Sequence, residues 1–266
     1  MSAPSDWIVP DWPAPPSVHA VFTRRCGGAS LAPFDSFNLG DHVRDEPAAV
    51  AQNRAQLAEK LGQRPVFLQQ VHGTAVLLLD AHTPDGAVAD ACLSTGHGVA
   101  CTIMVADCLP VLFAHASGVA VAAAHAGWRG LVQGVLENTF RALVAAVQRT
   151  DPAATPTSVA SETLTWLGPC IGPEAFEVGP EVREAFLSRQ PAAQQAFVSS
   201  GGGKFLANLP ALARLRLAAL GITRVSGNDG TAAWCTVAQP SSFFSHRRDA
   251  ARLGSTGRMA ACIWRV

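Results

Sequence analysis

Short apolar runs of β-strand length alternate along this chain with longer stretches whose apolar residues recur at helical spacing. The β-type runs are 18–23 (VHAVFT), 65–71 (PVFLQQV), 99–113 (VACTIMVADCLPVLF), 119–124 (VAVAAA), 163–167 (TLTWL) and the end of the chain from Arg258. The helical stretches are 45–62, 131–149, 181–189 and 208–221. This alternation is typical of the α/β class.

Two of the predicted helices carry start and stop signals. The stretch 45–62 has Asp45 as N-cap, a proline in its first turn and a terminal glycine. The stretch 208–221 has Asn208 as N-cap and ends at Gly221. Short polar side chains can accept hydrogen bonds from the free N–H groups of a first turn, and glycine is favoured just past a helix end.

The run 99–113 is almost entirely apolar, as expected for a strand that is covered on both faces. Its exception is the triplet Ala106-Asp107-Cys108. A carboxylate inside a buried strand is costly unless it has a partner. Asp107 could orient a ligand histidine, bind substrate, or cap a turn before Pro110, and the sequence leaves these three roles open.

Several segments are predicted as connections. Residues 1–17 are rich in proline and are expected to form an extended arm before a single domain of residues 18–266. A polar bridge is expected at 90–98 and a surface connection at 150–162. The segment 243–249 (FFSHRRD) has the composition of a loop.

The composition of the chain limits the classes of function that it can have. The chain has 266 residues and is 48% hydrophobic, which is ample for a sizeable core. Its 20 basic and 20 acidic residues cancel without a run of like charge, which argues against nucleic acid or an anionic membrane surface as partner. We therefore expect a small-molecule partner. Eighteen of the cations are arginines, which suit phosphate or carboxylate recognition, and nothing in the pattern indicates an oligomeric state.

The cysteines and the start of the chain predict a cytoplasmic location. Seven cysteines without a CxxC pair make a poor disulfide framework. The first residues have neither a basic nor an apolar leader region, and no apolar run approaches the roughly 20 residues that span a bilayer.

Three side chains of metal-binding type follow β-type runs: His72, Cys108 and His125. Ligands in α/β folds bind outside the carboxyl ends of strands, so these side chains can converge although they are distant in sequence. A Cys and two His suit Zn²⁺ and leave its fourth position open for catalysis. The alternative is a Cys108 nucleophile with His125 as its base. The residue types alone leave both hypotheses open.

Three arginines are candidates for binding an anion. Arg129 lies in GWRG, at a predicted strand-to-helix turn where exposed N–H groups also favour phosphate. Arg25 stands beside the turn at Gly27 and Gly28, which could equally be an ordinary hairpin loop with solvated arginines. Arg247, in FFSHRRD, could bind substrate or belong to a salt-bridged turn. Asp107 and Arg247 join Arg25 as substrate or phosphate candidates.

A set of motifs connects these candidates. The segments TRRCGGAS, NLG, QQVHG, MVADCLPVLF, AHAGWRG, GPCIGPEAFEVG and FFSHRRD with TGR occur in this order. Together they resemble the bacterial laccase-domain family, also labelled polyphenol oxidases, from about Val18 to the C-terminus. The combination of ADCLP with AHAGWRG is the most specific part. The resemblance implies a four-layer αββα sandwich with mixed β-sheets, similar to cysteine hydrolases.

The resemblance also implies a function. It points to Zn²⁺ bound by His72, Cys108 and His125, and to phosphorolysis of adenosine, inosine or guanosine. Adenosine deamination and methylthioadenosine phosphorolysis are implied as side activities. Family members are also linked to editing of peptidoglycan precursors, so the alternative is an amidase that uses Cys108 or zinc-bound hydroxide. Neither the deaminase nor the amidase reaction needs phosphate.

Two features qualify the resemblance. Blue-copper oxidases need many histidines, largely in His-x-His pairs, and the eight histidines here contain no such pair. The laccase label therefore does not describe the expected mechanism, although Cu²⁺ could occupy the site in place of Zn²⁺. In addition, the family usually has Tyr where His246 stands and Asp where Asn208 stands.

Overall fold

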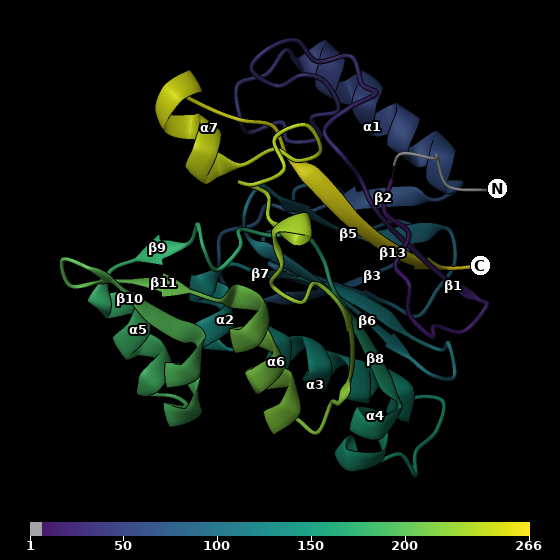
Figure 1. Cartoon of the computed structure of the whole chain (residues 1–266). Coiled ribbons are helices and arrows are strands. Elements are labelled where there is room, and N and C mark those ends of the chain that lie inside the picture. Colours follow the sequence, from purple (N-terminus) through teal and green to yellow (C-terminus); the bar gives the residue numbers. More distant parts are fainter. Residues whose placement is uncertain (1–6) are drawn as a thin grey trace.

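The computed structural model describes residues 7–266 (Figure 1), so the first six residues of the predicted arm lie outside the described part. The rest of the arm is held against the domain. Ile8 forms an antiparallel bridge with Phe22, and the buried Trp7 ring lies 5.6 Å from that of Phe37.

Two mixed sheets form the centre of the molecule. Within residues 7–266, the smaller sheet has the order β1-β13-β5-β2: β1 (Val18–Phe22), β13 (Met259–Arg265), β5 (Val99–Val105) and β2 (Arg64–Phe67). The larger sheet has the order β12-β8-β6-β7-β4-β3: β12 (Arg224–Gly227), β8 (Thr163–Leu167), β6 (Leu109–His115), β7 (Val121–Ala126), β4 (Ala91–Ser94) and β3 (Val76–Leu79). A third sheet is made of β10 (Phe197–Gly201), β11 (Lys204–Ala207) and β9 (Glu177–Val178).

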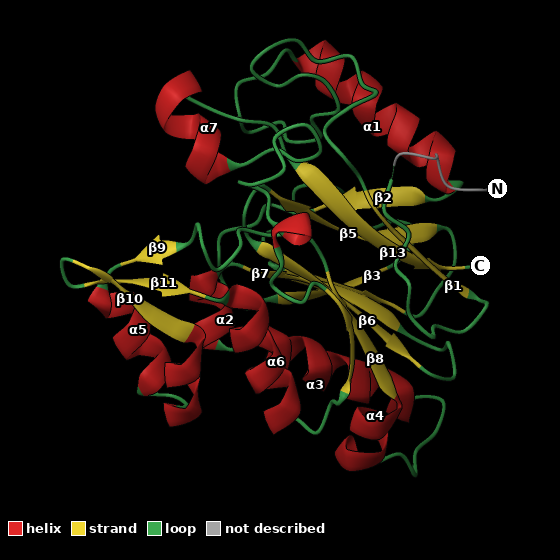
Figure 2. Ribbon diagram, in the orientation of Figure 1, coloured by secondary structure: helices red, strands yellow, loops and turns green. Residues whose placement is uncertain are grey.

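Helices cover the outer faces of the two central sheets (Figures 1 and 2). Helix α1 (Pro47–Leu61) packs on the four-stranded sheet through Leu57 and Leu61. The six-stranded sheet is covered by α2 (Trp128–Gln133), α3 (Val135–Gln148), α4 (Pro156–Glu162) and α6 (Leu209–Ala219). Helix α5 (Pro180–Leu187) packs against α2 and against β11 of the three-stranded sheet. A separate apolar core fills the space between the sheets. The structure thus has the expected four layers, helix, sheet, sheet and helix.

The run 99–113 is two strands rather than one. It divides into β5 and β6, which belong to different sheets, and the turn between them holds Cys108. Asp107 in this turn has a φ of 94°, an unusual value for a residue with a side chain. The chain therefore leaves the four-stranded sheet and enters the six-stranded sheet within three residues.

Other sequence predictions also need correction. The expected polar bridge at 90–98 contains the buried strand β4, and the connection at 150–162 ends in α4. The helix expected at 131–149 is two helices, because Gly134 adopts a φ of 104° between α2 and α3. Strand β3 was not predicted.

The helix caps agree only in part with those predicted from the sequence. The N-cap of α1 is Glu46 rather than Asp45, and it makes no side-chain capping bond. Asn208 caps α6 as expected, by accepting a hydrogen bond from the Ala211 N–H. The segment FFSHRRD is not a loop. Its last residues open α7 (His246–Leu253), and Ser245 caps this helix.

The remaining elements are two short 3-10 helices, Pro191–Ala196 and Ala232–Trp234. None of the helices in the described part of the chain combines the length and apolar character that a membrane crossing requires.

Candidate metal centre

The side chains of His72, Cys108 and His125 come together at one point, as the sequence predicts. Their ligand atoms all lie within 4.8 Å of one another, and His72 Nε2 is 3.6 Å from Cys108 Sγ. The two imidazole rings meet edge to face with centroids 4.8 Å apart. Two ring nitrogens and a sulfur at this separation form a donor set that suits a borderline-soft cation.

The three donors arrive from both central sheets. His72 lies on the connection from β2 to β3, with a left-handed φ of 60°, rather than directly after a strand. Cys108 occupies the turn between β5 and β6, and His125 lies inside β7. His72 and Cys108 thus stand on two connections at which the chain passes from the four-stranded to the six-stranded sheet.

Asp90, just before β4, fixes the two histidines. Its fully buried carboxylate accepts hydrogen bonds from His125 Nδ1 at 2.9 Å and from the His72 backbone N–H at 2.8 Å. It also accepts from the N–H groups of Val71 and Gly73, at 3.1 and 2.6 Å. With Nδ1 of His125 occupied, Nε2 is the nitrogen left for a ligand.

Sequence reasoning missed Asp90 and offered Asp107 as the orienting carboxylate instead. The available signal was an aspartate directly before the apolar segment ACLS, which is the same pattern that drew attention to Asp107.

The charges at the centre favour an ionised thiol. Burial disfavours the Cys108 thiolate, but the charge of His125 and hydrogen bonds with both histidines outweigh burial and lower the Cys108 pKa to about 6. Burial likewise disfavours a protonated His125, but Cys108 and Asp90 raise the His125 pKa to about 9. The thiolate is both the metal-binding and the nucleophilic form of cysteine, so this arrangement fits either role of Cys108.

Two glycines leave space for the centre. A Cβ atom on Gly127 would lie 2.8 Å from Cys108 Sγ and 2.9 Å from His72 Cδ2. A Cβ atom on Gly130 would lie 2.9 Å from the Gly73 carbonyl oxygen. Both positions require glycine because the start of α2 approaches the His72 segment closely, which explains the glycines on either side of Trp128 and Arg129.

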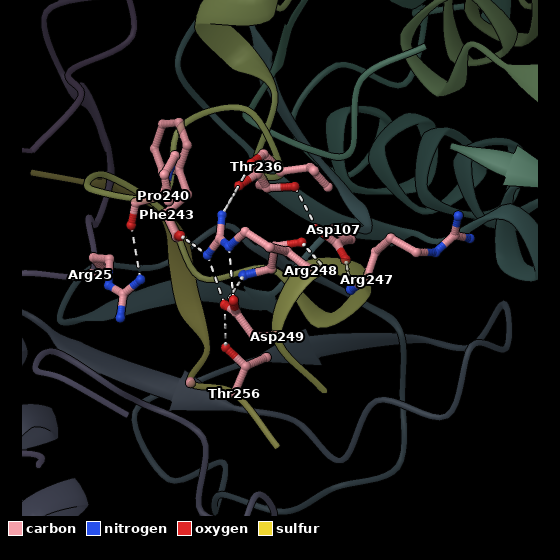
Figure 3. Close-up of polar contacts among 12 residues, drawn as sticks. Arg25, Asp107, Thr236, Pro240, Phe243, Arg247, Arg248, Asp249 and Thr256 are labelled. Carbon is pink, nitrogen blue, oxygen red and sulfur yellow. Dashed lines mark hydrogen bonds and ion pairs between the residues drawn. The ribbon is translucent and has the colours of Figure 1, made fainter. Parts of the chain in front are cut away.

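Asp107 contacts the C-terminal segment and neither metal-site histidine. Its Oδ1 accepts a hydrogen bond from Thr236 Oγ1 at 2.5 Å, and its Oδ2 accepts from the Arg247 backbone N–H at 2.6 Å (Figure 3). The carboxylate of Asp107 therefore joins the β5–β6 turn to the start of α7.

The centre opens into a cavity of about 780 Å³. Asp107, Arg129 and Arg247 all line this cavity, so the structure brings them together with the three donors. Arg25 does not line it. Its guanidinium donates to the Pro240 carbonyl and pairs with Asp35 at 3.2 Å.

The cavity arginines are held in different ways. The exposed Arg129 guanidinium lies over the Trp128 ring, 4.5 Å from its centroid, at the start of a helix of only six residues. Arg247 donates to the carbonyl oxygens of Ala175 and Glu177. Its neighbour Arg248 forms the salt bridge that the alternative hypothesis for this segment expected, but in the first turn of α7 rather than in a loop.

Arg248 is a structural residue of this turn (Figure 3). It pairs with Asp249 at 2.7 Å and donates to the Thr236 and Phe243 carbonyl oxygens. The two adjacent arginines therefore differ, because Arg248 stabilises the loops and Arg247 faces the cavity.

Comparison with known proteins finds relatives of this chain both by sequence and by structure. The family model described as "Multi-copper polyphenol oxidoreductase laccase" matches residues 19–266. A Pseudomonas aeruginosa protein named purine nucleoside phosphorylase PA4543 is 50% identical over 97% of this chain and 98% of its own length. Purine nucleoside phosphorylase YfiH of Escherichia coli is 47% identical over 98% of this chain and 100% of its own length. The crystal structure of Neisseria meningitidis protein NMB0706 superposes with a TM-score of 0.85 at 44% identity, covering 98% of this chain and 99% of that one.

Proposed function

The chain belongs to the multi-copper polyphenol oxidoreductase laccase family, and from that premise we propose that it is a zinc-dependent purine nucleoside phosphorylase. Its substrates would be adenosine, inosine or guanosine together with inorganic phosphate. The observation that carries the proposal is a Cys/His/His donor set that faces a cavity lined by arginines, in a chain whose relatives carry the name of this activity.

His72, Cys108 and His125 would hold one Zn²⁺, which would supply a Lewis acid at the cavity that these residues line. Within residues 7–266 this is the one cluster of three or more side chains of metal-binding type. A multinuclear copper cluster would need more such groups, so we propose a single metal ion. Cu²⁺ binds similar ligands with higher intrinsic affinity and is the competing occupant.

Phosphorolysis breaks the bond between C1′ of the ribose and the purine nitrogen, and it forms a bond from C1′ to a phosphate oxygen. The protein must bring a phosphate dianion to the sugar and stabilise a cationic transition state. Arg129 and Arg247 line the cavity and provide positive charge for phosphate. Asp107 would keep the Cys108 turn and Arg247 in a fixed relation, since its carboxylate contacts the Arg247 N–H.

Two hydrolytic reactions accompany this proposal. Adenosine deamination and methylthioadenosine phosphorolysis would be side activities. In deamination, water would react with the purine ring, whereas in phosphorolysis phosphate reacts with the sugar. The second candidate function is the amidase that edits peptidoglycan precursors, and the lowered pKa of Cys108 favours it, because a thiolate can attack an amide carbon. All seven cysteines are free thiols, which supports a reducing cytoplasm as the location.

Phosphate dependence separates these reactions. We expect the zinc-loaded protein to release free base and ribose-1-phosphate from inosine or adenosine only when inorganic phosphate is present. Chromatography of the reaction with and without phosphate measures this directly. Conversion of adenosine to inosine without phosphate would reveal deamination. Cleavage of an amide in a cell-wall precursor, with no base released from any nucleoside, would favour the amidase.

Replacement of Arg129 by alanine is expected to lower the rate of phosphorolysis by about 10²-fold or more, because it removes a positive charge from the cavity that receives phosphate. Steady-state kinetics at varied phosphate concentration provide the measurement. Arg141→Ala removes an equally exposed arginine from α3, outside the cavity, and is the control. Equal losses in both variants would show that only net charge matters.

A further inference from the structure

Arg258 also lines the cavity, together with Cys108 and Asp107. It lies immediately before β13 and is partly buried. None of the carboxylates in residues 7–266 forms an ion pair with it. Burial lowers its pKa, and the nearby charges of Cys108 and Asp107 oppose that shift. A guanidinium that is partly withdrawn from water and has no ion pair is well stabilised by an anion, so Arg258 is expected to have an anionic partner when the protein works.

The free edge of Arg258 has the geometry for an oxyanion. Its Nη1 donates to the carbonyl oxygens of Thr256 and Gly257, at 2.9 and 3.1 Å. Among the described residues, Nε and Nη2 have no hydrogen-bond acceptor. These two groups form the side of a guanidinium that can bind two oxygens of one phosphate in parallel.

The segment Asn38–Gly40 holds Arg258 in place. This segment is the NLG motif, which has no part in the metal centre or in the contacts of Arg129 and Arg247. The buried Asn38 Oδ1 accepts the backbone N–H groups of Arg258 and Gly40, at 2.8 and 2.9 Å. The Leu39 N–H donates to the Arg258 carbonyl at 3.1 Å. A Cβ atom on Gly40 would lie 2.7 Å from Arg258 Cγ, so this position must be small for the side chain to pass.

The other charges at this end of the cavity already have partners. Arg54 pairs with Asp41 at 3.2 Å and donates from Nε to the Leu39 carbonyl. His42 has a lowered pKa because of its burial and the nearby charge of Arg258, which favours a neutral imidazole there. Arg258 thus differs from Arg54 in having no ion pair within residues 7–266, which leaves its charge available to a ligand.

We propose that Arg258 binds the phosphate co-substrate beside the metal centre, through Nε and Nη2, and that Asn38–Gly40 positions it for this role. The presence of an anion site rests on the contacts of Arg258, and its assignment to inorganic phosphate rests on the proposed function. Arg129 and Arg247 also line the cavity but are both exposed, whereas Arg258 is partly buried, so they would contribute charge from more solvated positions.

The test is calorimetric titration of the zinc-loaded protein with inorganic phosphate, which needs no turnover. Arg258→Met should weaken phosphate binding about 10- to 100-fold, the range expected for hydrogen bonds to a charged group. Arg258→Lys keeps the charge but loses the paired donors, so its loss should be smaller. Arg252→Ala removes an exposed arginine of α7 outside this cavity and should bind phosphate like the wild type.

A further variant and a stability measurement complete the design. Gly40→Ala leaves the charge in place but displaces the side chain, and it should weaken phosphate binding as well. If Arg258→Met melts at a much lower temperature, Arg258→Lys decides the question. The proposal would be overturned if Arg258→Met binds phosphate with wild-type affinity. It would also be overturned if both Arg258→Lys and Gly40→Ala do so.

Catalysis then tests the assignment separately. The KM for phosphate should rise in Arg258→Met more than the KM for nucleoside. If phosphorolysis occurs with an unaltered phosphate KM, the proposed function stands and the role of Arg258 is refuted. If Arg258 governs phosphate binding but no nucleoside is cleaved, the anion site stands and the proposed function fails.

Discussion

Cys108→Ala is expected to leave the protein with less than about one tenth of the wild-type zinc, because it removes one of the three proposed protein ligands. His125→Ala should have the same effect, and phosphorolysis should be lost in both variants. Elemental analysis of the purified proteins after dialysis measures the metal directly.

The matched control is Cys26→Ala, which removes an exposed thiol that contacts the Ser241 carbonyl, away from the centre. It should retain zinc at about one ion per chain. Full zinc in the Cys108 and His125 variants would refute the ligand assignment. If Cys108→Ala alone keeps its zinc but loses activity, Cys108 is instead a nucleophile, as the amidase hypothesis requires.

Asp90→Ala is expected to lower zinc affinity about 10- to 100-fold, although Asp90 is not itself a ligand. Its carboxylate fixes the His125 ring and receives the N–H groups of the His72 segment, so both histidines lose their orientation without it. The variant should also lose about 2–4 kcal/mol of stability, since several donors in this region are left without their acceptor. Competition with a zinc chelator and urea unfolding measure the two effects.

Asp90→Asn keeps the shape of the side chain but turns one acceptor oxygen into a donor, so it should lie between alanine and the wild type. Asp85→Ala provides a comparison. Asp85 also lines the cavity, but its carboxylate accepts a hydrogen bond from the Phe67 N–H rather than from either histidine segment. If Asp90→Ala and Asp85→Ala bind zinc equally well, Asp90 does not orient the site.

The sequence predicted the main elements because their periodicity is local. It also predicted the convergence of His72, Cys108 and His125, since each is a donor near an apolar run. The division of 99–113 between two sheets could not be predicted, because a strand buried in either sheet is equally apolar.

Helix α7 shows a different limit. Its only buried residue is Asp249, so it has no apolar stripe to distinguish it from a loop. Its first turn is joined to the β5–β6 turn by the hydrogen bond from the Arg247 N–H to Asp107, across 140 residues of chain. Asp90 and His125 likewise meet across 35 residues, and a single sequence gives no sign of such pairing.

The sheet-changing connections that carry His72 and Cys108 have a consequence for assembly. His125 belongs to the six-stranded sheet, and His72 and Cys108 lie on connections whose other ends are fixed by the four-stranded sheet, so docking of the two sheets would complete the orientation of the proposed ligands. Retention of the proposed ion would then report whether the two sheets have docked. A partial opening between the sheets would weaken its binding before either sheet unfolds, and a bound ion would oppose that opening by its own binding free energy.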